Sequence, residues 1–183
     1  IIKYYNKMEL KLENFQVRKS KPIIFGNAGL PDGVERYHLE GMKMIGIDIF
    51  SGDKITISNG EGSQSIEMVS FDEYGNCKSL INKNLNDEAQ FIKEKIKDDT
   101  YRNFIQNLKK KKFNFENLES YNYFDKDTLG GDKCELLVEK NGFALLAAPG
   151  KLMDISSSEV ATDFYIYIER KNKQNIKNKA FLP

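Results

Sequence analysis

The sequence predicts an α+β fold that is mainly β: an antiparallel β-barrel or sandwich-like sheet with one helical insertion at about residues 87–111. Three observations support this. Apolar residues alternate with polar ones at period 2 from residue 45 to residue 71, which is typical of strands with one buried face. Turns that contain Gly interrupt the alternation at residues 51–53 and 59–62. The apolar period changes to that of a helix only in the middle of the chain.

Most of the predicted strands lie in the first half of the chain. A short strand is expected at residues 8–12, and the Gly and Pro residues of segment 21–33 predict a loop. The next strands are expected at residues 37–50, 54–58 and 65–71. Their regular spacing indicates a β-meander, which ends at a Gly-containing turn over residues 72–76.

The helical insertion is predicted as two short helices or one kinked helix. Residues 86–88 (Asn-Asp-Glu) offer an N-cap and acidic groups, which suit the positive end of a helix. Asp98 begins a second cap, and the apolar stripe after it continues to Leu108. The lysines at 109–112 then lie at the negative end of the helix dipole.

The second half of the chain returns to strands. The aromatic segment 113–124 is expected to cover one edge of the sheet. Residues 134–138 and 143–148 are predicted to pair as a hairpin, because the Asn141-Gly142 dipeptide between them is a strong hairpin signal. A last strand is expected at residues 164–168.

Length and composition predict one β-rich domain at residues 1–170 and a basic linker at 171–183 that leads towards a downstream domain. The net charge of +1 gives no reason to expect a nucleic-acid partner. No apolar run approaches the roughly 20 residues of a membrane span. Cys77 and Cys134 are too few for a secreted disulfide framework. We therefore expect reduced thiols in a cytoplasmic protein, with a disulfide between the two as the alternative.

No catalytic residue and no metal ligand is assigned from the sequence. His38 is the single histidine, so a hydrolase would have to use it with Asp32 or Asp48 as the orienting carboxylate. The local sequence contains no nucleophile elbow, and a hydrogen-bonded histidine at the start of a strand is the more ordinary interpretation. One histidine and two distant cysteines also make a poor zinc ligand set.

Ligand binding is the more open question. Residues Glu61, Gly62 and Gln64 place a carboxylate and an amide on a turn whose glycines would let a ligand approach the backbone. We take these three residues and His38 as the candidate ligand-binding residues. The alternative is a tight turn whose polar side chains are simply solvated. The lysines at 109–112 lie beside aromatic residues, as in proteins that bind single-stranded nucleic acid. At a helix end, however, lysines also complement the dipole, and acidic residues elsewhere balance their charge, so no nucleic-acid partner is expected.

Several short motifs resemble one family. The quoted segments are Gly-Asp-Lys-Ile-Thr-Ile at 52–57, Glu-Gly-Ser-Gln at 61–64, Val-Ser-Phe-Asp at 69–72, Leu-Leu-Ala-Ala-Pro-Gly at 145–150, Met-Asp at 153–154 and Lys-Ala-Phe-Leu-Pro at 179–183. They resemble the N-terminal accessory region of aminomethyltransferase (glycine-cleavage T-protein-like) enzymes and the related urea-carboxylase-associated proteins. Glu61, Gly62 and Gln64 are the only residues of this chain to which the resemblance assigns a functional position, because they match the turn motif of the family. The His and Cys ligands of stand-alone members have no counterparts here.

The resemblance implies a non-catalytic, substrate-shaping domain of a folate-dependent one-carbon enzyme. It also implies a downstream transferase domain in the same polypeptide, where tetrahydrofolate would bind, and no cofactor in this chain. Two alternatives stay open. One is a free-standing small-molecule binder, or an enzyme of the urea-carboxylase-associated type, that uses Glu61, Gln64 and His38. The other is a protein-interaction module that exposes aromatic residues of segment 113–124.

Overall fold

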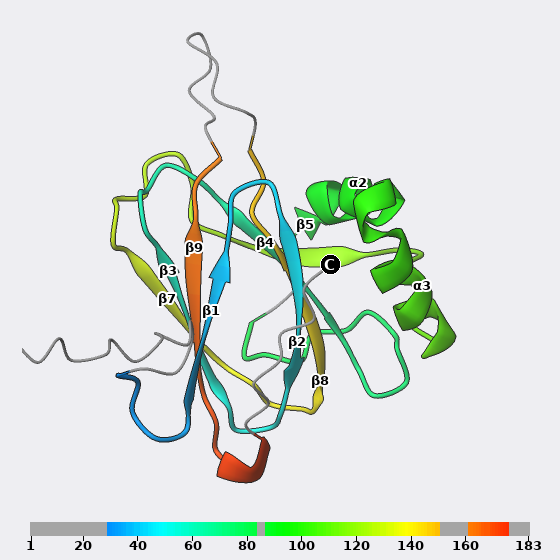
Figure 1. The fold of residues 1–183 in the computed structure, drawn as a ribbon, viewed down its shortest axis with the longest axis horizontal. Coiled ribbons are helices and arrows are strands. Elements are labelled where there is room, and N and C mark those ends of the chain that lie inside the picture. The colour runs from blue at the N-terminus through cyan, green and yellow to red at the C-terminus, as the bar shows by residue number, and fades with distance from the viewer. Residues whose placement is uncertain (1–28, 84–86, 151–160, 176–183) are drawn as a thin grey trace, which may run out of the picture.

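The chain forms two antiparallel β-sheets packed face to face, with helices on the outer face of one sheet (Figure 1). The structure, a computed structural model, describes residues 29–83, 87–150 and 161–175. The predicted α+β, mainly β, sandwich-like class is therefore confirmed. The strand expected at residues 8–12 lies outside the described residues.

The first sheet has four strands in the order β1-β9-β3-β7. Their bounds are Val34–Leu39 for β1, Phe164–Glu169 for β9, Lys54–Asn59 for β3 and Lys133–Leu137 for β7. Burial alternates along β3 and β9, as the period-2 pattern predicts. The polar outer face of this sheet is therefore compatible with contact with water.

The second sheet has five strands in the order β2-β8-β4-β6-β5. Their bounds are Met44–Ile49 for β2, Gly142–Ala147 for β8, Ile66–Phe71 for β4, Glu119–Tyr123 for β6 and Asp87–Glu88 for β5. Every residue of β4 is buried. Polar residues are interspersed with apolar ones along β4, but buried and exposed residues do not alternate, because both faces of this sheet are covered.

The predicted strand pairing was wrong in two places. Strands β2, β3 and β4 do not form a meander, because β3 belongs to the other sheet. Strands β7 and β8 do not form a hairpin either, since β7 pairs with β3 and β8 pairs with β2 and β4. The connection through Asn141-Gly142 is a corner between the sheets, where Asn141 Oδ1 accepts a hydrogen bond from Ser51 N at 2.9 Å. Period-2 patterns specify strands but not their partners.

Two helices and a short 3₁₀ turn make up the insertion, as predicted. They are α2 (Gln90–Lys97), η1 (Asp99–Tyr101) and α3 (Arg102–Lys110). Asp98 caps the second unit by accepting a hydrogen bond from Thr100 N at 2.9 Å. The first cap was predicted incorrectly, because Asp87–Glu88 is the strand β5 and Glu67 of β4 bonds the N–H groups of α2 instead. A final 3₁₀ turn, η2 (Lys173–Asn175), follows β9.

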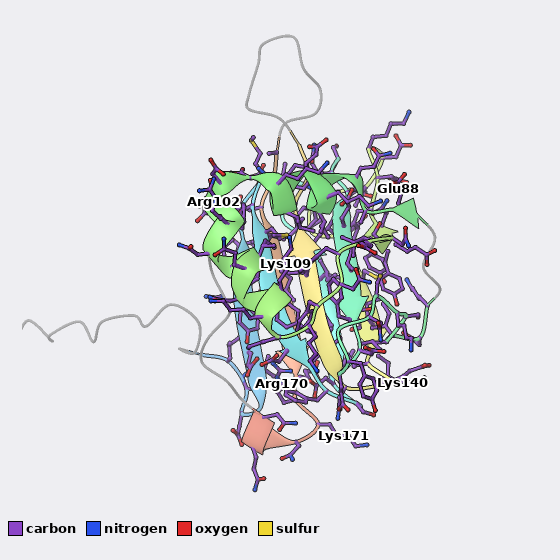
Figure 2. All side chains as sticks on the ribbon, turned by 90° about the vertical axis from the view of Figure 1, so that its right-hand side faces the viewer. Glu88, Arg102, Lys109, Lys140, Arg170 and Lys171 are labelled. Atoms are coloured by element: carbon purple, nitrogen blue, oxygen red, sulfur yellow. The ribbon has the colours of Figure 1, made fainter. Side chains whose placement is uncertain are left out.

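Two hydrophobic cores hold these layers together. The larger core lies between the sheets. The smaller one lies between the five-stranded sheet and the helices, which face the viewer in Figure 2. In the smaller core, Gly46 leaves room for aromatic rings, since a Cβ there would lie 2.4 Å from Phe143 and 2.9 Å from Phe104. Among the described residues, no helix is long and apolar enough to cross a membrane.

The aromatic segment 113–124 supplies both cores rather than a surface. Phe113 and Phe115 pack edge-on against Phe71 in the smaller core. Tyr121 and Tyr123 of β6 are buried between the sheets. The exposed aromatic patch that an interaction module would need is therefore not formed by the side chains of this segment.

Candidate functional site

His38 lies near the end of β1, on the outer face of the four-stranded sheet, and its side chain is about half exposed. The register places it directly opposite Tyr165 of β9. The two rings stack with centroids 5.1 Å apart and an interplanar angle of 15°. Because both residues lie on regular strands, the imidazole is held by the sheet rather than by a loop.

Asp163 orients this histidine from the residue before β9. Its Oδ2 lies 2.7 Å from His38 Nε2, and its Oδ1 accepts a hydrogen bond from Gly41 N at 2.9 Å. Partial burial alone would raise the pKa of Asp163, but the Gly41 N–H and His38 outweigh it, so the pKa lies below the ordinary value. The carboxylate is therefore charged at neutral pH. The expectation of Asp32 or Asp48 as the orienting carboxylate was wrong.

The turn at residues 59–62 is organised by the buried Asn59 at the end of β3. Its Oδ1 accepts a hydrogen bond from Gly62 N at 2.8 Å, and its Nδ2 donates to Gln64 O at 3.0 Å. A side-chain amide thus satisfies two backbone groups of the turn. Sequence analysis did not single out Asn59, although Asn is a common turn residue.

Gly62 is required by packing of one loop against another. It has a φ of +86°, and a Cβ there would lie 2.7 Å from both Gly130 N and Thr128 O. The space that glycine leaves is thus filled by the neighbouring loop of the same chain. The Gln64 side chain is buried and that of Glu61 is exposed, so Glu61 is the residue of this motif that can meet a ligand without rearrangement.

The turn and the histidine meet at Asp163. Gly60 N donates a hydrogen bond to Asp163 O at 3.4 Å, and Glu61 is the next residue along the chain. The four predicted ligand-binding residues therefore belong to one end of the sandwich, which we call the His38 end. This end carries an imidazole oriented by Asp163 and the exposed side chain of Glu61, which are both groups that can bind a polar ligand. Nothing in the structure tests a ligand role for these residues, which stays a prediction.

Among the described residues, no three His, Cys, Asp or Glu side chains are arranged as metal ligands. Cys77 and Cys134 are both free thiols that are partly buried. Burial raises the pKa of each thiol above the ordinary value.

An open surface pocket of about 410 Å³ lies at the other end of the molecule. Three connections form its walls: the β2–β3 turn at Ser51, the segment after β4, and the β7–β8 corner at Lys140 and Asn141. Figure 2 shows Lys140 at this end, far from Arg102 of α3. The sequence showed the turn at residues 72–76 but gave no signal that these three connections converge.

Comparison with known proteins finds a counterpart within a longer enzyme. No family model matches the chain. The chain is 27% identical over 153 residues to trimethylamine-oxide aldolase of Ruegeria pomeroyi, and the aligned part is 82% of this chain. The chain spans about a fifth (19%) of the length of that protein.

Proposed function

We propose that this chain is a non-catalytic accessory domain of a larger one-carbon enzyme. The observation that carries the proposal is the match to 19% of trimethylamine-oxide aldolase, which relates the chain to a part of a longer enzyme. The turn motif supports it as well, because Asn59 and Gly62 serve internal packing. Residues of the turn that stabilise the fold itself, rather than a bound ligand, are what a structural domain needs.

The resemblance to aminomethyltransferase-like enzymes supplies the remaining parts of the proposal. The catalytic partner is a downstream transferase domain of the same polypeptide, and tetrahydrofolate binds there. The sandwich shapes or covers the active site of that domain. Its two-sheet core makes it a rigid unit for that purpose.

A binding experiment tests the assignment of tetrahydrofolate to the other domain. Calorimetric titration of the isolated chain with tetrahydrofolate should give no heat of binding, whereas the full natural polypeptide should bind it. A dissociation constant for the isolated chain equal to that of the full polypeptide would place the cofactor here and refute the proposal.

The His38 end supports a second candidate function, binding of a small polar molecule. Asp163 orients His38, and the turn that carries Glu61 contacts Asp163 through Gly60. Thermal-shift screening with amine and carboxylate metabolites would test it. A ligand should raise the melting temperature of the natural protein and not that of Glu61→Ala or His38→Ala. Lys54→Ala, at the opposite end of β3, should respond normally. Equal shifts in all variants would exclude this site.

A further inference from the structure

Lys83 contacts residues of both sheets through its ammonium group. Lys83 Nζ lies 3.7 Å from Cys134 Sγ on β7. The same nitrogen lies 4.8 Å from the centroid of the Tyr123 ring on β6. A thiol and an amine are therefore neighbours where the two sheets approach each other.

The backbone that carries Lys83 is tied to β7. Asn82 N donates a hydrogen bond to Leu137 O, and Leu137 N donates to Asn82 Oδ1, both at 3.1 Å. Ser79 Oγ donates to Lys83 O at 2.6 Å. The approach of Lys83 to Cys134 is therefore set by the fold rather than by a freely moving loop.

Tyr123, whose ring Lys83 contacts, also carries a buried polar group. Its hydroxyl is buried and has no hydrogen-bond partner among the described residues. The pKa of Tyr123 is raised, mainly by burial and to a smaller extent by the nearby Cys134. A buried hydroxyl without a partner is costly.

We propose that Lys83 and Cys134 form a reversible covalent crosslink, a sulfenamide bond between Nζ and Sγ, with hydrogen peroxide as the oxidant. Neither the proposed accessory role nor the His38 end is needed for this inference. The bond would join the segment before β5 to strand β7.

The reaction balances in two steps. The Cys134 thiolate attacks peroxide, the O–O bond breaks, and the sulfur becomes a sulfenic acid while hydroxide leaves. The neutral amine of Lys83 then attacks the sulfur, the S–OH bond breaks, and water leaves with one amine proton. Overall, a thiol, an amine and one peroxide give the S–N bond and two waters. A thiol reductant restores both side chains by forming its own disulfide.

The surroundings predict that the crosslink forms faster as the pH rises. Burial raises the pKa of Cys134, while the charge and hydrogen bond of Lys83 act in the opposite direction and Glu135 adds to the increase. Tyr123 is a further titratable group near Cys134. Because burial raises the pKa of Cys134, its reactive thiolate becomes abundant only in alkaline solution.

Mass spectrometry of the protein treated with peroxide in alkaline buffer is the test. The expected product joins the peptides that contain Lys83 and Cys134, and its mass is that of the two peptides less two hydrogens. Dithiothreitol should reverse it. Cys77→Ser should still form it, whereas Lys83→Gln and Cys134→Ser should not. Because the bond closes a loop between residues 83 and 134, the melting temperature should rise on oxidation.

Cys77 is the internal control, since its thiol is also partly buried but its sulfur contacts Glu119 O rather than an amine. Absence of the S–N product in the natural protein overturns the proposal. So does a sulfenic acid at Cys134 that dimedone traps completely while Lys83 stays unmodified. A crosslink that persists in Lys83→Gln would show that another group reacts, and would overturn it as well.

Discussion

Asn59 connects the turn between β3 and β4 to the chain on both sides. The side-chain amide bonds Gly62 N and Gln64 O, and the backbone of the same residue bonds Gly131 and Asp132. One buried polar residue thus holds the turn and the neighbouring loop together. The position of Glu61 at the His38 end depends on this arrangement.

Replacement of Asn59 by alanine should therefore cost about 2–4 kcal/mol of unfolding free energy, because two buried backbone groups lose their partners. Urea denaturation measures the change. Ser58→Ala, at the neighbouring partly exposed position, is the control and should change stability by less than about 0.5 kcal/mol. Equal effects of the two substitutions would show that the amide of Asn59 does not organise the turn.

Asp163 predicts a pH dependence of stability. Its pKa is lower in the folded protein than the ordinary value of 3.8. The carboxylate therefore contributes stability above that value, and the contribution is lost as the pH falls below 3.8 and through the folded-state pKa. Asp163→Asn should remove this part of the acid dependence.

Thermal unfolding of the natural protein and Asp163→Asn between about pH 2 and pH 6 checks this expectation. The stabilities of the two proteins should converge at the acid end and diverge as the pH rises. Asp127→Asn, which removes an exposed carboxylate from another loop, should follow the natural protein. Parallel curves for the natural protein and Asp163→Asn would contradict the interpretation.

At the scale of elements, α2 is attached to the sheet by Glu67 of β4. Its Oε1 accepts a hydrogen bond from Phe91 N at 3.1 Å, and its Oε2 accepts one from Ile92 N at 2.9 Å. A buried carboxylate at the positive end of a helix is favoured by the free N–H groups and by the dipole. The cap comes from a distant strand, so the residues just before the helix did not reveal it.

Glu67→Ala should destabilise the protein by about 1.5–3 kcal/mol, because two charge-assisted hydrogen bonds are lost. Amide hydrogen exchange should accelerate at Phe91 and Ile92 more than in the sheets. Glu94→Ala, on the exposed side of α2, is the matched control. If exchange were unchanged in Glu67→Ala, another contact would have to hold the start of the helix.

Arg170 joins three elements of the sandwich at the end opposite His38. Its Nη2 lies 2.6 Å from Glu35 Oε2 on β1, and its Nη1 lies 2.6 Å from Asp53 Oδ2 in the β2–β3 turn. Nη1 also donates to Asp48 O at 2.9 Å. All three charged side chains are buried. A buried pair is costly to break because the remaining charge has no compensation.

Arg170→Met should therefore lower the unfolding free energy by about 3–5 kcal/mol. Arg36→Met, which removes an exposed arginine from the outer face of β1, should have little effect. Chemical denaturation of both variants makes the comparison. A loss below about 1 kcal/mol for Arg170→Met would mean that the cluster does not hold these elements together.

The strands and helices could be predicted from the sequence because their periods are local properties of the chain. The alternation of Ile55 and Ile57 indicates β3 directly, and the spacing up to Leu108 indicates α3. Pairing could not be predicted in this way. Asn141-Gly142 is compatible with a hairpin and with a corner between two sheets, and long-range contacts decide between them.

The same limit applies to the His38 end. The sequence was enough to name His38 and Glu61 as candidate ligand-binding residues. It could not identify Asp163 as the partner of His38, because the two are 125 positions apart. The role of Asp163 depends on the pairing of β1 with β9. Gly62 was noticed for the space it leaves, although only the fold shows that another loop fills that space.

At the scale of the whole molecule, the two sheets are covered differently. The five-stranded sheet carries α2 and α3 on its outer face (Figure 1). The outer face of the four-stranded sheet is polar and includes the exposed Arg36 and His38. A unit with a fixed core and a polar face suits a domain that works beside a catalytic partner. The alignment with part of a longer enzyme is consistent with that arrangement.

The accessory role is tested most directly by the rate of one-carbon transfer to tetrahydrofolate in the longer natural polypeptide, measured with and without residues 29–175. The proposal predicts that the isolated domain is inactive. It also predicts that the deleted polypeptide still folds and binds tetrahydrofolate but turns over more slowly or with a higher KM. Turnover by the isolated domain, or unchanged kinetics after the deletion, would contradict it.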